Sequence, residues 1–130
     1  MHLLITLVLA IASPWPVTPA GSVAQQWVNA FPSETAMRAF YARNLEPEDI
    51  QKRSIDARIE TWRESQKQFG TLKFASIVSS KPEELKVMLL ANDGEKREYT
   101  FTVRPSPPHK LVSITRTEYE HHGHGLFPWH

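Results

Sequence analysis

The densest group of chemically versatile side chains lies near the end of the chain, where His121, His122 and His124 fall within four positions. Imidazole is a good ligand for zinc, copper and nickel, so a metal site is the first function to consider. Glycines follow His122 and His124, and a metal would have to order this loose backbone as it bound. We therefore expect residues 121–130 to form a flexible His-rich tail without a physiological metal site. The alternative is that its apolar side chains dock on a neighbouring surface (Leu126, Phe127 and Trp129).

Motifs for nucleophilic or metal-assisted hydrolysis are absent from the sequence. No serine is followed three residues later by lysine, and neither G-x-S-x-G nor H-E-x-x-H occurs. The chain has no cysteine, which excludes disulfides, thiolate metal sites and a cysteine nucleophile. Its acidic residues fall at expected helix starts or on solvent-facing positions, so no carboxylate pair calls for acid–base catalysis. We predict no catalytic residue and no cofactor.

Aromatic side chains are the remaining candidates for a site, and five are expected to face inward: Trp27, Phe40, Tyr41, Trp62 and Tyr99. They either fill the core or line a cavity that takes a small apolar ligand. Sequence cannot separate these alternatives, because both require large apolar side chains on the inner faces of the elements. Tyr41 and Tyr99 would also suit a small pocket enzyme of the isomerase, cyclase or hydratase type.

Composition favours one ordinary globular domain. The chain has 130 residues, of which 41% are hydrophobic and 22% charged, and its net charge is +1. The Lys and Arg residues are scattered rather than clustered, so the sequence offers no footprint for nucleic acid. We expect a mixed, solvated surface.

The N-terminal segment resembles a secretory signal peptide. Residues 3–12 form an apolar run, LLITLVLAIA, that is shorter than the roughly 20 residues of a membrane span. Thr18-Pro19-Ala20 then offers small residues for cleavage before Gly21, although no basic residue precedes the run. We predict that residues 1–20 are a signal peptide, that the protein is secreted or periplasmic, and that it has no membrane contact after cleavage. A mispredicted start and a buried N-terminal strand are the alternatives.

Helical spacing of apolar residues marks the next part of the chain. The spacing predicts a helix over residues 22–31, and a second helix capped by Ser33. Glu46 begins an acidic, proline-containing stretch that predicts a further turn or two. The clearest helix starts at its N-cap Ser54 and ends at Gly70, where a left-handed conformation costs glycine little.

After Gly70 the apolar period changes to two, which predicts strands over residues 72–78, 85–91, 98–104 and 110–119. Asn92-Asp93-Gly94 is a strong hairpin signal. Three helical segments followed by four consecutive strands predict an α+β domain over residues 21–120, of order α-α-α-β-β-β-β. In it the helices pack on the concave face of a curved, four-stranded antiparallel sheet.

Four local patterns resemble a known family: Ala30-Phe31-Pro32-Ser33, Met37-Arg38-Ala39-Phe40, Gly70, and Pro107-Pro108-His109-Lys110-Leu111. They are similar to the nuclear transport factor 2-like, cystatin-related cone domain of bacterial exported proteins. That domain often sits beside a serine beta-lactamase-like hydrolase or a carboxy-terminal-processing-type peptidase. The resemblance implies a cone with helices over its concave face, pairing through the outer sheet face, and a separate hydrolase chain as partner. Pro32 departs from the more usual asparagine, which affects the turn.

The sequence thus predicts an exported, non-catalytic binding or accessory module with a cone-shaped ligand pocket. A pocket enzyme and a structural dimerisation domain are the two alternatives. A buried Asp or Glu in the cavity would favour the enzyme, and a neighbouring hydrolase gene would favour the accessory role.

Overall fold

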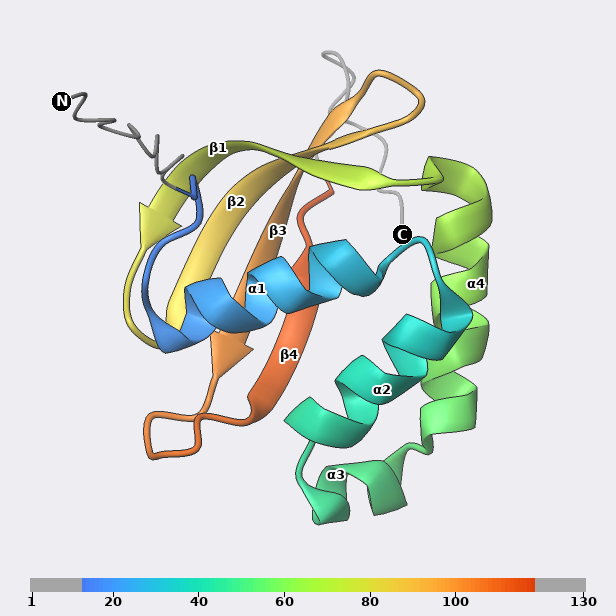
Figure 1. Ribbon diagram of the computed structural model, residues 1–130, viewed down its shortest axis with the longest axis vertical. Helices are drawn as coiled ribbons and strands as arrows, with labels where there is room; N and C mark the ends of the chain where they lie inside the picture. The colour runs from blue at the N-terminus through green and yellow to red at the C-terminus, as the bar shows by residue number, and fades with distance from the viewer. Residues whose placement is uncertain (1–12, 119–130) are drawn as a thin grey trace, which may run out of the picture.

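The structure, a computed structural model, describes residues 13–118 and has the predicted α+β architecture (Figure 1). Its helices are α1 (Pro19–Ala30), α2 (Glu34–Asn44), α3 (Pro47–Lys52) and α4 (Ile55–Phe69). Its strands are β1 (Leu72–Ser80), β2 (Glu84–Ala91), β3 (Lys96–Val103) and β4 (Leu111–Arg116). The turn expected after Glu46 is the six-residue helix α3.

Side-chain caps fix where the helices begin. Ser33 accepts a hydrogen bond from the backbone N–H of Ala36 at 3.2 Å, and Ser54 accepts one from Ala57 at 3.1 Å. Gly70 closes α4 with a φ of 72°, a conformation that favours glycine. These three boundaries agree with the sequence prediction. Ser54 and Gly70 therefore determine where α4 begins and ends, without help from residues distant in the sequence.

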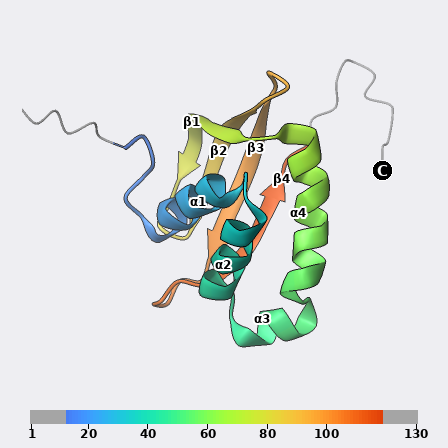
Figure 2. The same cartoon turned by 45° about the vertical axis from the view of Figure 1, so that its right-hand side comes forward.

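The four strands form an antiparallel meander in the order β1-β2-β3-β4. Buried and half-buried residues alternate along β2 and in the second half of β3, as expected for a sheet that is covered on one face. Within residues 13–118 β4 is the last strand of the sheet, so one of its sides has no strand partner among them. This free edge turns toward α4, as both views show (Figures 1 and 2).

The main core lies between α1 and the concave face of the sheet. Trp27 of α1 packs against Tyr99 and Phe101 of β3, with ring centroids 5.5 and 5.4 Å apart. Phe40 of α2 and Ile59 of α4 are fully buried and extend this core. Figure 2 shows α4 at the side of the molecule, next to β4 rather than across the sheet.

The folded region begins before the expected mature start at Gly21. Helix α1 begins at Pro19, with Thr18 as the N-cap that accepts from Gly21 N–H at 2.9 Å. Trp15 is buried and packs edge-on against Phe74 of β1, with centroids 4.9 Å apart. Cleavage after Ala20 would therefore cut within the first turn of α1.

Two other sequence predictions concern membranes and the tail. No helix within residues 13–118 is long and apolar enough to cross a membrane. The predicted His-rich tail, residues 121–130, lies outside the described residues, as does the apolar N-terminal run of residues 3–12.

Candidate functional site

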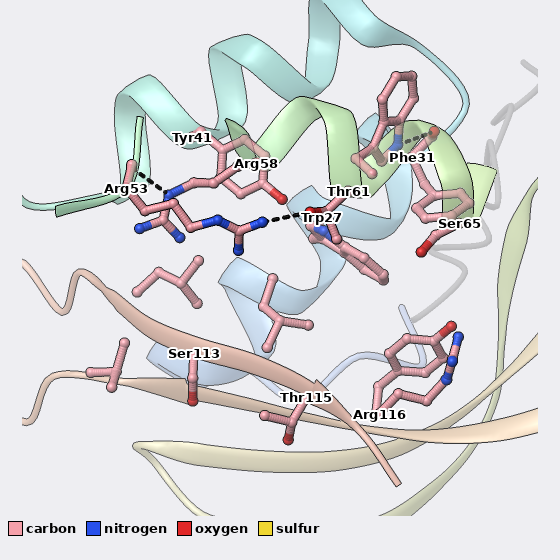
Figure 3. A pocket seen from close by; sticks show the side chains of 15 residues that line it. Trp27, Phe31, Tyr41, Arg53, Arg58, Thr61, Ser65, Ser113, Thr115 and Arg116 are labelled. Atoms are coloured by element: carbon pink, nitrogen blue, oxygen red, sulfur yellow. Dashed lines mark hydrogen bonds between the residues drawn. The ribbon is translucent and has the colours of Figure 1, made fainter. Parts of the chain in front are cut away.

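A pocket of about 270 Å³ opens between α4 and the free edge of β4. We call it the α4–β4 pocket (Figure 3). It is lined by side chains or backbone of Trp27, Phe31, Tyr41, Arg53, Arg58, Thr61, Trp62, Ser65, Tyr99, Leu111, Val112, Ser113, Ile114, Thr115 and Arg116. All six residues of β4 are in this set, so the strand forms one wall along its whole length.

The β4 wall presents unpaired backbone to the pocket. The N–H of Thr117 donates to the carbonyl of Glu98 at 2.9 Å, so these two residues form a hydrogen-bonded pair at the end of the β3–β4 pairing. Hydrogen-bonded and non-hydrogen-bonded pairs alternate along antiparallel strands. In that alternation Ile114 and Arg116 direct their backbone N–H and C=O away from β3, toward the pocket. Ser113 and Thr115 turn their side chains to the outer face and border the pocket with their backbone.

Aromatic side chains form the inner surface of the pocket. Four of the five predicted ligand-binding residues line it, namely Trp27, Tyr41, Trp62 and Tyr99. The fifth, Phe40, does not line it and is fully buried, with its ring edge-on to Tyr41. Adjacent residues of a helix point about 100° apart, so Phe40 and Tyr41 cannot both face the same space. The indole N–H of Trp62 donates to the Phe31 carbonyl at 2.9 Å and fixes that ring.

Two arginines stand together at the α3–α4 corner of the pocket, beside Tyr41 (Figure 3). Arg58 donates from Nε to the Arg53 carbonyl at 3.1 Å and from its guanidinium to the Asp49 carbonyl at 3.2 Å. Arg53 donates to the hydroxyl of Thr61 and to the carbonyl of Ala57. The Asp49 carboxylate is held by Arg104 at 2.9 Å instead. Within residues 13–118, neither Arg53 nor Arg58 forms a salt bridge.

Tyr41 and Trp27 add neutral donors to this corner. Burial raises the pKa of the Tyr41 hydroxyl, whereas the charge of Arg58, the indole N–H of Trp27 and the charge of Arg53 act in the opposite direction. Tyr41 therefore keeps its proton at neutral pH. The Trp27 Nε1 atom is buried and makes no hydrogen bond of standard geometry among the described residues. We call Arg53, Arg58, Tyr41 and Trp27 the donor cluster.

The opposite end of the pocket is electrically balanced. Arg116 donates to the Glu118 carboxylate at 2.7 and 2.9 Å, and its guanidinium also stacks 5.0 Å from the Phe69 ring centroid. Burial raises the pKa of Tyr99, opposed by a hydrogen bond from Arg116 and by the charges of Arg116 and Arg97. Uncompensated positive charge therefore lies only at the donor cluster among the fifteen lining residues, none of which is Asp, Glu or His.

The sequence analysis did not single out Arg53, which follows α3, or Arg58 of α4. A signal was present: Arg58 follows Ile55 by three positions and precedes Trp62 by four, so it lies on the same face as both. No group of three or more His, Cys, Asp or Glu in the described part of the chain is placed to hold a metal ion. The histidines of the tail lie outside that part.

Comparison with known proteins gives no match, whether with protein-family models, with curated proteins or with solved structures. The resemblance to nuclear transport factor 2-like domains therefore stays a proposal. Function has to be argued from the pocket itself.

Proposed function

We propose that this protein is a non-catalytic binding module whose α4–β4 pocket takes one small ligand. The observation that carries the proposal is a concave space of about 270 Å³ that brings four aromatic residues together with hydrogen-bond donors that have no acidic partner among residues 13–118. Small-molecule sites characteristically combine an apolar, aromatic lining with a few converging polar groups. The isomerase-type alternative would require a tuned carboxylate, and the lining residues supply guanidinium, phenol and indole groups instead.

A packing argument also supports binding over a purely structural role. Buried N–H and C=O groups in folded proteins are almost always paired. Here the buried Trp27 indole N–H borders the pocket and makes no hydrogen bond of standard geometry among the described residues. A ligand with an acceptor atom, or ordered water in its place, would satisfy it.

Export is the second part of the proposal. The apolar run of residues 3–12, followed by small residues before Gly21, supports export with residues 1–20 as the signal peptide. N-terminal sequencing of protein recovered from the periplasm or medium of its native host should show that the apolar run has been removed. A start at Gly21 would match the sequence prediction, whereas a start before Trp15 would keep its contact with Phe74 and the Thr18 cap. Recovery of the intact Met1 form from the cytoplasm would contradict export.

Three further proposals rest on the sequence resemblance. They are membership of the cone family, a homodimer through the outer sheet face, and a separate hydrolase chain as partner. Of the four exposed large apolar residues within the described chain, Val17 precedes α1, and the other three are on the outermost strands, at Ile77 and Val78 of β1 and at Val112 of β4. They lie at opposite edges of the sheet, so they do not by themselves favour one pairing face.

The binding proposal is tested by filling the pocket. Ser65 of α4 lines it, and Ser65→Phe would place a ring in the space. Lys67→Phe adds the same ring on an exposed part of α4 outside the lining and is the matched control. Isothermal titration with 2-naphthoate and 2-naphthamide should show one-site binding of at least one compound to the native chain and to Lys67→Phe. Binding of neither compound to the native chain, or undiminished binding to Ser65→Phe, would refute the proposal.

A further inference from the structure

Four hydrogen-bond donors come together at one corner of the α4–β4 pocket, and this composition indicates what kind of ligand group belongs there. The Tyr41 hydroxyl interacts with Arg58, with the Trp27 indole N–H and with Arg53. The side chains come from three different helices, α1, α2 and α4, and from Arg53 in the residue after α3. We propose that the ligand is a small carboxylic acid with a flat apolar body, whose carboxylate binds at the donor cluster. This inference rests on the proposed binding function.

Charge at the cluster is uncompensated. Arg58 and Arg53 donate only to backbone carbonyls and to the Thr61 hydroxyl, which are neutral acceptors. Five other arginines of the described chain form salt bridges, as Arg104 does with Asp49 and Arg116 with Glu118. Arg43 donates to the amide oxygen of Gln26 instead, but it does not line the pocket. An anion that enters the corner would supply the missing negative charge, and a carboxylate matches the fork of a guanidinium group.

The guanidinium groups are also held in place before a ligand arrives. The two carbonyl acceptors of Arg58 lie at the C-terminal end of α3, and Thr61 fixes Arg53 from the next turn of α4. Arginines fixed in this way lose little further conformational entropy on binding, which favours affinity. The buried indole N–H of Trp27 is a further donor that a second carboxylate oxygen would satisfy.

The remainder of the pocket defines the body of the ligand. Trp27, Trp62 and Tyr99 provide aromatic surface beyond the cluster, so a flat apolar group would stack there. The volume of about 270 Å³ is near the lower end of small-molecule sites, which begin at about 300 Å³. A one- or two-ring carboxylic acid is therefore a better fit than a long acyl chain.

The experiment compares a carboxylate with its neutral isostere by isothermal titration. In the native chain 2-naphthoate should bind about tenfold or more tightly than 2-naphthamide, because only the carboxylate pairs a negative charge with the guanidinium groups and can accept from both prongs of a guanidinium fork. Sodium acetate, which has the charge without the rings, should not displace 2-naphthoate at equal concentration. Equal affinity for the acid and the amide would overturn this inference but leave the binding function standing, whereas no binding by either would overturn both. Competition by acetate would refute the apolar body.

Arginine variants locate the contact. Arg58→Gln should lower the affinity for 2-naphthoate about tenfold and leave that for 2-naphthamide within about twofold. Arg53→Gln should act in the same direction and is free of folding complications, because this side chain is exposed. Arg63→Gln, on the same helix but outside the lining, is the matched control and should change neither affinity. If neither Arg53→Gln nor a folded Arg58→Gln changed the preference for the acid, the carboxylate would bind elsewhere and the assignment would be wrong.

Discussion

Replacement of Trp62 tests whether α4 is held by the packing described above. Trp62 is only 7% exposed, and its indole N–H donates to the carbonyl of the fully buried Phe31 at 2.9 Å. This bond joins the middle of α4 to the end of α1, and it spans 31 positions of sequence. Trp62→Ala removes both the ring and the donor, whereas Trp62→Phe keeps most of the apolar surface and removes the donor.

The expected magnitudes follow from these two contributions. A buried tryptophan removes about 150–250 Å² from water, which at about 25 cal/mol per Å² corresponds to about 4–6 kcal/mol. One side of Trp62 borders the pocket rather than packed atoms, so the lower part of this range applies. A buried carbonyl that loses its partner costs about 1–3 kcal/mol. We expect Trp62→Ala to lower the free energy of unfolding by about 5 kcal/mol, the upper end of the usual cost of truncating a buried aromatic side chain, and Trp62→Phe by about 1–3 kcal/mol.

Urea denaturation followed by circular dichroism provides the assay, since the helix signal does not depend on the tryptophan that is removed. Arg63→Ala is the control: its side chain is on the exposed side of α4, where it pairs with Glu34 at 2.6 Å. Loss of such a surface pair should cost less than about 1 kcal/mol. Equal losses for Trp62→Ala and Arg63→Ala would refute the orientation of α4, and equal losses for Trp62→Ala and Trp62→Phe would refute the packing contribution.

Three further predictions concern the ends and the surface of the domain. A chain starting at Gly21 should unfold at least about 3 kcal/mol more easily than one starting at Ser13, because it lacks buried Trp15 and the Thr18 cap, and urea titration of both chains would measure this. Ser54→Ala should cost about 1 kcal/mol in the same assay through loss of the α4 cap, while Ser106→Ala in an exposed turn should cost under about 0.5 kcal/mol. The hydrogen bond from Arg63, and to a smaller extent that from Arg38, lowers the pKa of Glu34 below 4.5. The contribution of Glu34 to stability is therefore present above pH 4.5 and is lost as the pH falls through its lower pKa in the folded state. Urea midpoints of the native chain and Glu34→Gln should therefore differ at pH 6 and converge at acid pH; a difference independent of pH would contradict the ion-pair origin.

The elements of this fold follow from short-range patterns, which explains why sequence predicted them. Ser33, Ser54 and Gly70 act through bonds within one turn of their own helix, and Asn92-Asp93-Gly94 sets a hairpin through local backbone preference. The start of α1 was misplaced for the same local reason. Apolar spacing placed the start of the first helix at residue 22, yet Pro19 occupies the first helical position, where its missing N–H costs nothing.

The pocket could be predicted only in part, because it depends on contacts between distant segments. Inward aromatic residues were found from helical and strand spacing, and four of the five line the space. The spacing of α2 could not choose between Phe40 and Tyr41 before the position of α4 was known. Carbonyls at the end of α3 hold Arg58 in place, and neither Arg53 nor Arg58 has an acidic partner within the described chain. Both features depend on the tertiary structure and cannot be predicted from a pattern in one sequence.

A physical reason for the pocket emerges from the position of β4. An edge strand exposes unpaired N–H and C=O groups, and proteins commonly protect such edges by covering them with a helix. Here α4 lies alongside the edge but leaves a pocket of about 270 Å³ between the helix and the strand. The helix keeps other strands away from this edge, while the polar backbone groups of the edge form no backbone hydrogen bonds across the pocket among the described residues. A purely apolar ligand in this space would desolvate Ile114 and Arg116 backbone groups and the donor cluster without compensation, at a cost of about 1–3 kcal/mol for each group. An amphipathic acid avoids that cost at the donor cluster, where its carboxylate accepts hydrogen bonds, and this energetic difference is why we favour it over the wholly apolar ligand expected from the aromatic residues alone.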